Sequence, residues 1–206
     1  MTESTNYFNT FCTISRALGT AATLEELLDL IVQNAIDAMK GKAACLFLAD
    51  ERRDLFVPMA QKGLSDDYLH ANPLKAQKIV KALLAKGHLV FADATTDPRL
   101  EHHDAKRKEG IASLLTVPVR VKDRPIGVLS LYTAERREFT GAEIDFLSAL
   151  AEQGGMAIEK TRLLERIQKN ALLFLDLASA INSTLDINSV LNTLTVKVSE
   201  SLGMKG

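Results

Sequence analysis

The chain has 206 residues, 47% of them hydrophobic and 25% charged, so it is long and apolar enough to bury a core and does not have the composition of a disordered chain. Its 25 basic and 26 acidic side chains leave a net charge of −1, which argues against an electrostatic surface for nucleic acid or membranes, and we expect contact with neither. Two cysteines, no apolar leader and no bilayer-length apolar run predict a cytoplasmic protein without a disulfide framework.

The first 42 residues are predicted to form two helices. A helix over residues 5–18, within an N-terminal segment 1–22, carries an apolar stripe that includes Phe8 and Phe11. A second helix starts after Thr23, which is followed three residues later by Glu26 as in a capping box. Its apolar stripe consists of Leu24, Leu27, Leu28, Ile31, Ala35 and Met39, and Gly41 marks its end.

A first β-hairpin is expected next. The compact apolar run 43–49 reads as a strand buried on both faces, and residues 55–61 read as its partner. The polar turn 50–54 joins the two.

The middle of the chain is predicted to be short helices and loops. A helix opens at Asn72-Pro73 and ends near Lys86-Gly87, and a short strand covers 88–91. Residues 93–100 are rich in turn formers and read as a loop. The charged segment 101–109, which Gly110 closes, reads as a helix with a solvated face.

Residues 111–133 give the clearest strand signal. Apolar residues alternate through two runs on either side of the polar turn 122–124, as in a β-hairpin. Both faces of this hairpin are apolar, so helices must cover one or both sides of the sheet.

A long helix follows. Thr140 and Glu143 form a second capping box, and an apolar stripe then continues past residue 170. Gly154-Gly155 is a weak point that costs about 1 kcal/mol per glycine relative to alanine. Because this helix is longer than one domain needs, we expect it to pair with another copy in a homodimer. The residues expected on the dimer and signalling helices are Phe8, Phe11, Ile144, Leu147, Ala151, Ile158, Leu164 and Ile167.

The end of the chain repeats its beginning. Phe11 aligns with Phe174 and Leu28 with Leu191, and the apolar stripes of the two segments also align. We therefore expect a linker or signalling helix over 161–185. Residues 186–206 would be the first helix of a truncated second copy, and the chain would be a fragment of a longer protein.

Four sequence motifs together resemble those of a GAF domain. They are L-F-L-A-D (46–50), D-A-T-T-D-P-R (93–99), S-L-L-T-V-P-V (113–119) with I-G-V-L-S-L (126–131), and R-E-F-T-G-A-E-I (137–144). The resemblance covers residues 23–160. It implies an α+β fold in α/β/α layers, with an antiparallel sheet in the order 2-1-5-4-3, the terminal helices on one face and short helices and loops over the other. It also implies a regulatory, non-enzymatic role in a signalling protein such as a two-component system, with the effector outside this chain.

The family's small-molecule pocket would lie between the sheet and residues 73–110. Its candidate lining is Phe47, Phe91, Asp93, Arg99, Leu100, His103, Leu114, Thr116 and Leu129. Each of these could equally belong to the core or to a turn. Asp97 and Pro98 could start a helix, and Arg99 would pair either with a ligand anion or with a neighbouring carboxylate.

The residue types argue against several cofactors. Neighbouring residues on a helix point about 100° apart, so His102 and His103 do not chelate one ion well, and we expect neither metal nor haem. Within the family, a bilin is attached to a cysteine placed after the middle helices, where neither Cys12 nor Cys45 lies. Some GAF-like enzymes reduce free methionine sulfoxide with several pocket cysteines, and with at most one thiol near the core this chain lacks the nucleophile and its resolving partner.

Two functions stay open. Family members that bind cyclic nucleotides carry the motif Phe-x₃-Asp-Glu. In this chain the two residues at the corresponding spacing after Phe139 are Glu143 and Ile144, so the motif does not identify the ligand. The chain is either a small-molecule sensor that signals along its long helix, or a dimerisation scaffold without a ligand. A cavity of about 300 Å³ or more would favour the sensor.

Overall fold

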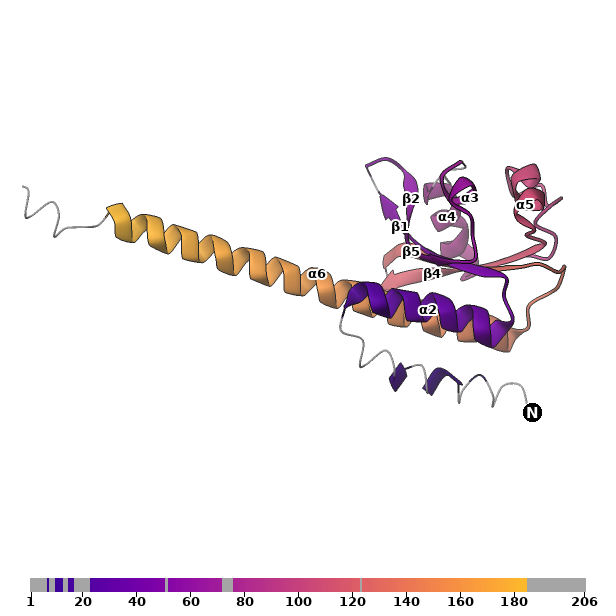
Figure 1. The fold of residues 1–206 in the computed structure, drawn as a ribbon, viewed down its shortest axis with the longest axis horizontal. Helices are drawn as coiled ribbons and strands as arrows, with labels where there is room; N and C mark the ends of the chain where they lie inside the picture. The colour runs from indigo at the N-terminus through magenta and orange to yellow at the C-terminus, as the bar shows by residue number, and fades with distance from the viewer. Residues whose placement is uncertain are drawn as a thin grey trace, which may run out of the picture. The chain divides into compact units, whose positions relative to one another are not determined.

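A computed structural model gives the fold of the chain (Figure 1). The residues that it describes are 7, 10–12, 15–16, 23–50, 52–71, 76–122 and 124–184. They fall into two compact units, Met1–Thr161 and Arg162–Gly206. The predicted helix over 5–18 lies largely outside the described residues, as does the predicted second copy beyond residue 184.

The first unit is built on one sheet. The helices are α2 (Leu24–Met39), α3 (Asp66–Ala71), α4 (Ala76–Lys86), α5 (His103–Glu109) and α6 (Gly141–Thr184). The strands are β1 (Ala43–Asp50), β2 (Leu55–Lys62), β3 (Leu89–Phe91), β4 (Ser113–Val121) and β5 (Arg124–Thr133). All neighbouring strands are antiparallel and the order is β2-β1-β5-β4-β3, which confirms the predicted sheet.

Helices cover both faces of this sheet. α2 and the first part of α6 lie on one face, and α3, α4 and α5 lie over the other (Figure 1). The α/β/α layers agree with the expectation from the apolar hairpin, which has side chains to bury on both faces.

The core between the sheet and helices α2 and α6 consists of the apolar stripes of both helices and alternate strand residues. Its fully buried members include Leu28, Ile31, Leu46, Leu115, Val117, Leu129, Leu131, Leu147, Leu150, Ala151 and Ile158. The predicted capping box at Thr140 is formed, and at Thr23 the side chain caps the helix as predicted. Thr23 Oγ1 accepts from the Glu26 backbone at 3.2 Å, and Thr140 and Glu143 bond to each other's backbone N–H groups at 3.3 and 2.8 Å.

This core corrects the predicted dimer helix. Leu147, Ala151 and Ile158 pack inside their own domain and are not available to another copy, and Ile144 packs against the same core. Phe11 is also half-buried against it, whereas Phe8 lies outside the described residues. Leu164 and Ile167 are exposed.

The glycine pair in α6 is not a break in the helix. A Cβ on Gly154 would meet the side-chain ends of Leu46 and Ile31 at 3.2 and 3.3 Å, so the missing side chain lets the helix approach the sheet. The helix thus continues through the pair, and the cost in helix propensity stays a prediction.

A second core fills the opposite face of the sheet. Its buried members are Ala43, Cys45, Phe47, Phe56, Leu64, Leu83, Phe91, Ala94, Ile111, Leu114, Val128 and Tyr132. Tyr68 of α3 meets Tyr132 edge-on at 6.2 Å between ring centroids. Burial raises the pKa of the Cys45 thiol, as expected for a cysteine that acts as a small core residue.

The middle helices differ from the prediction in two ways. α3 was not predicted, although Ser65 and the acidic residues after it form a helix start, with Ser65 Oγ accepting from Tyr68 N–H at 3.2 Å. The predicted start of the next helix at residues 72–73 lies outside the described residues. In α5, Lys106 is buried rather than solvated, and its Nζ donates to the Glu101 carbonyl at 2.5 Å.

Among the helices that the structure describes, none has a stretch sufficiently long and apolar to span a bilayer.

Candidate functional site

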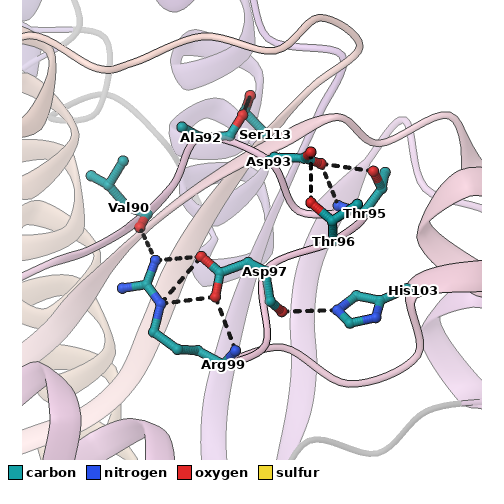
Figure 2. A network of polar contacts seen from close by, with 9 residues as sticks. All are labelled: Val90, Ala92, Asp93, Thr95, Thr96, Asp97, Arg99, His103 and Ser113. Atoms are coloured by element: carbon teal, nitrogen blue, oxygen red, sulfur yellow. Dashed lines mark hydrogen bonds and ion pairs between the residues drawn. The ribbon is translucent and has the colours of Figure 1, made fainter.

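The loop that follows β3 is held in shape by its own side chains (Figure 2). Asp93 accepts hydrogen bonds from the Thr95 hydroxyl at 2.7 Å, the Thr96 hydroxyl at 2.7 Å and the Thr95 backbone at 3.0 Å, and forms an ion pair with Arg136 at 2.8 Å. These bonds, mainly those from the two hydroxyls, lower the pKa of Asp93 to about 2. The carboxylate is thus ionised and fully engaged.

The second half of the loop is a clip between Asp97 and Arg99. The Asp97 carboxylate accepts from Arg99 Nε at 2.9 Å, from Nη2 at 2.5 Å and from the Arg99 backbone at 2.9 Å. These bonds lower the pKa of Asp97 and raise that of Arg99. Arg99 therefore pairs with a neighbouring carboxylate, one of the two alternatives that the sequence left open.

The other contacts of Arg99 are with the edge strand of the sheet. Its Nη2 donates to the carbonyl of Val90 at 3.1 Å, and its guanidinium carbon lies 4.5 Å from the centre of the Phe91 ring (Figure 2). The loop is thus fastened to β3 by a charged side chain.

Asp97 is not a helix cap, contrary to one of the sequence interpretations. α5 begins at His103, and its N-cap residue His102 has a left-handed backbone with φ 59°. A ring nitrogen of His103 lies 2.8 Å from the Asp97 carbonyl oxygen, so this histidine supports the turn. No cluster of three or more potential metal ligands occurs within the described part of the chain.

An open cavity of about 530 Å³ lies beside this loop. Its walls are β3, the Asp93–Arg99 loop and the residues around the start of α6. The lining residues are His88, Val90, Ala92, Asp93, Thr96, Asp97, Pro98, Arg99, Glu138, Phe139 and Ile144. Because Val90, Phe139 and Ile144 also contact the core under α2 and α6, this groove, which we call the β3 groove, lies on that side of the sheet.

The structure divides the predicted lining residues between the β3 groove and the core on the opposite face of the sheet. Asp93 and Arg99 line the β3 groove, whereas Phe47, Phe91 and Leu114 are buried in the opposite core with Leu100 packed against it. On that face the hydroxyls of Thr116 and Ser130 are hydrogen-bonded at 3.0 Å.

Leu129 was placed on the wrong face. It pairs across the sheet with Leu46 and Val117, and it is buried with them under α2 and α6. It cannot line a pocket under the middle helices.

Sequence reasoning missed the part of the site that comes from residues 136–139. Arg137 Nη2 donates to the Met39 carbonyl at 2.9 Å and pairs with Glu143 at 3.1 Å, and its guanidinium lies 4.8 Å from the Phe139 ring. The signal was present, because two consecutive arginines stand just before a capping box.

The fold and the motif positions define the class of the protein. The model of the GAF domain family matches residues 21–159, and the chain belongs to this family. It is 43% identical over 65 residues to the sensor histidine kinase YhcY of Bacillus subtilis (strain 168), a match that covers 32% of this chain and 17% of that kinase.

Solved structures agree with this fold. The GAF domain of a phosphoenolpyruvate-protein phosphotransferase from Coxiella burnetii has a TM-score of 0.69 at 23% identity, over 79% of this chain and 98% of that one. A domain of a putative two-component sensor histidine kinase protein from Sinorhizobium meliloti 1021 has a TM-score of 0.61 at 21% identity, over 72% and 99% of the two chains.

Proposed function

We propose that this chain is a regulatory, non-enzymatic GAF module of a sensor-kinase type of signalling protein, and that α6 passes its state on to an effector through a homodimer. The observation that carries this proposal is the composition of α6. Up to Ile158 the helix supplies core residues to the domain, and from Leu163 to Leu177 its large apolar side chains are exposed. Similarity to the kinase of B. subtilis supports the signalling role.

The exposed residues of α6 gather mainly on one side of the helix. At 100° per residue, a stripe about 120° wide holds Leu163, Leu164, Ile167, Ala171, Phe174 and Leu175. Leu164 and Ile167 are 50% and 63% exposed. The other side of the helix holds the charged residues Arg162, Glu165, Arg166 and Lys169 in its first turns, and the exposed residues Leu172, Leu173 and Leu177 further along. An apolar stripe opposite a charged side is the pattern of helices that pair with one another.

Sedimentation velocity on the full chain tests the dimer. Leu164→Asp should weaken association at least tenfold, because it puts a charge into the apolar stripe, while the circular dichroism spectrum stays unchanged. The matched control is Leu173→Asp, the same change at a residue 51% exposed on the opposite side of the helix. A wild-type chain that is monomeric at high concentration, or equal losses in both variants, would contradict the proposal.

The β3 groove is the place where we propose that a small molecule acts. Its volume of about 530 Å³ lies within the range of small-molecule sites, and it adjoins the start of α6. A ligand there would contact the Asp93–Arg99 loop and Glu138 together. Binding could then shift α6 because the two arrangements of the helix start would have different affinities for the ligand.

Thermal unfolding with cyclic GMP, cyclic AMP, ATP and individual amino acids tests this part. A ligand at 100 times its Kd adds about 2.7 kcal/mol to the free energy of unfolding and raises Tm by several degrees. Glu138→Lys reverses a charge in the groove lining and should change the rise for charged compounds, whereas Thr116→Val on the opposite face should leave it unchanged. A rise that is changed by Thr116→Val and not by Glu138→Lys would place the ligand site on the face of the sheet under α3, α4 and α5.

A scaffold without a ligand is the second candidate. It is favoured by the dense packing of Phe47, Phe91 and Leu114, each less than 8% exposed, on the face where the family's pocket was expected. If none of the compounds raises Tm while dimerisation persists, the scaffold function is the better account.

A further inference from the structure

The sheet has two free edges, and each is blocked by a different device. In the order β2-β1-β5-β4-β3, the outer strands are β2 and β3. An edge strand offers unpaired backbone N–H and C=O groups to any other strand, and folded proteins block such edges with proline, bulges or charged side chains.

On β2 the block lies in the strand itself. Pro58 has no N–H to donate, and the pairing with β1 shifts register next to it, so that Met59 is an extra residue. The exposed side chains on either side of Pro58 are apolar, with Val57 42% and Met59 43% exposed. Without the proline and the bulge, this strand would be an apolar edge open to pairing.

On β3 the block comes from the loop. Residues 88–92 read H-L-V-F-A, so the strand carries no Lys, Arg, Asp or Glu of its own. Phe91 belongs to the core on one face of the sheet, and Val90 packs against the core on the other. Arg99 stacks on Phe91 and also bonds the carbonyl of Val90, so its side chain must cross the edge of the strand.

Asp97 fixes the guanidinium in this place. Its carboxylate binds both Nε and Nη2 of Arg99, which leaves the side chain little freedom to leave the edge. The charge stays on both partners at neutral pH, because their pKa values are shifted apart by the pairing.

We propose that Arg99 keeps the edge of β3 closed against the same strand of a second copy of this chain. A second copy is the occupant that we infer, because an edge strand that is apolar and carries no charge can pair with the same strand of another copy. The role of the D-P-R motif is then to prevent a strand of another chain from pairing with β3, and Arg99 is the residue that blocks this edge. This inference does not depend on the proposed dimer through α6.

The test is sedimentation velocity on the full chain with Arg99→Met. Methionine keeps an apolar stem over Phe91 and removes every side-chain donor to Val90 and Asp97. The weight-average mass should about double if the wild type is a monomer. It should rise at least twofold if the wild type is an α6 dimer, because each dimer then has two β3 edges and the association does not close. The matched control is Arg136→Met, which removes an ion pair from the same loop and should keep the wild-type mass.

Hydrogen exchange locates the new contact. Amides of residues 88–92 should gain protection in the associated Arg99→Met chain and lose it on dilution. A folded Arg99→Met chain with the wild-type mass would overturn the proposal, as would association without protection of these amides. Should Arg99→Met not fold, Arg99→Lys serves instead, because lysine cannot bind Asp97 and Val90 together in the fork geometry of arginine, and the same two outcomes decide.

Discussion

Gly155 of α6 lies so close to Arg120 of β4 that a Cβ on the glycine would fall 2.0 Å from the arginine's carbonyl oxygen. No Cβ can occupy that distance, and the obstacle is backbone rather than a flexible side chain. The separation between α6 and the sheet is therefore set at this residue, and a larger residue must move the helix.

Gly155→Ala should destabilise the domain although alanine is the better helix former. The gain of about 1 kcal/mol in helix propensity is outweighed by the shift of a packed helix, for which overpacking costs about 1–3 kcal/mol. We expect a lower Tm in calorimetry. The control is Gly141→Ala, where a Cβ meets no atom within 4 Å, and which should leave Tm unchanged or raise it. Equal Tm values for the wild type and Gly155→Ala would show that α6 moves at no cost.

Ile158 and Leu164 belong to the same apolar stripe in the sequence, but replacing their side chains by alanine should affect the free energy of unfolding differently. Ile158 is 1% exposed in the core, so Ile158→Ala should lower the free energy of unfolding by about 2–5 kcal/mol. Leu164→Ala, at a half-exposed residue, should change it by less than about 0.5 kcal/mol at concentrations where the chain is monomeric. Urea unfolding measures both, and similar losses at the two residues would contradict the assignment of Ile158 to the core.

The Asp93 carboxylate should make stability depend on pH in acid. Its pKa is about 2 in the folded chain, below the value of about 3.9 expected in the unfolded chain, so the unfolded state binds protons first as the pH falls. Its contribution is complete above about pH 4 and is lost as the pH falls toward 2. Urea midpoints of the wild type and Asp93→Asn should thus differ above pH 4 and converge below it. Midpoints that stay parallel over this range would contradict the shift.

The capping box of α6 should contribute to stability through Thr140. The threonine hydroxyl accepts from the Glu143 N–H, and the Glu143 carboxylate returns a bond to the Thr140 N–H. Thr140→Ala should cost about 1 kcal/mol, and Thr140→Ser, which keeps the hydroxyl, should cost much less. Thermal unfolding measures the difference, and two equally destabilised variants would show that the methyl group, rather than the cap, matters.

Features that depend on nearby residues were predictable from the sequence. The capping boxes at Thr23 and Thr140 span three residues, and the alternation in β4 and β5 is local, so each could be identified without knowledge of the fold. The strand order came from the resemblance of four motifs to a family rather than from physical reasoning on single segments.

The errors concern partners that are distant in the sequence. Leu129 was assigned to the wrong face of the sheet. The face on which a β5 residue lies relative to β4 depends on the register of the two strands, and this register shifts between Val119 and Arg120. Periodicity shows that Ile158 is covered by something, but not whether the covering surface is its own sheet or another copy. The partner of Arg99 could not be predicted for the same reason, because a short motif does not show whether an arginine binds a neighbouring carboxylate such as Asp97 or a ligand anion.

Arg136 and Arg137 are consecutive, and they hold different parts of the domain. Arg136 binds Asp93 in the loop, and Arg137 binds Glu143 in the first turn of α6 and the last carbonyl of α2. Only one peptide unit separates the attachment of the loop from that of the two helices. A displacement of Asp93 would therefore reach the two helices through two adjacent arginines and through β4, because the Ser113 hydroxyl of that strand accepts from the Arg137 N–H at 2.8 Å.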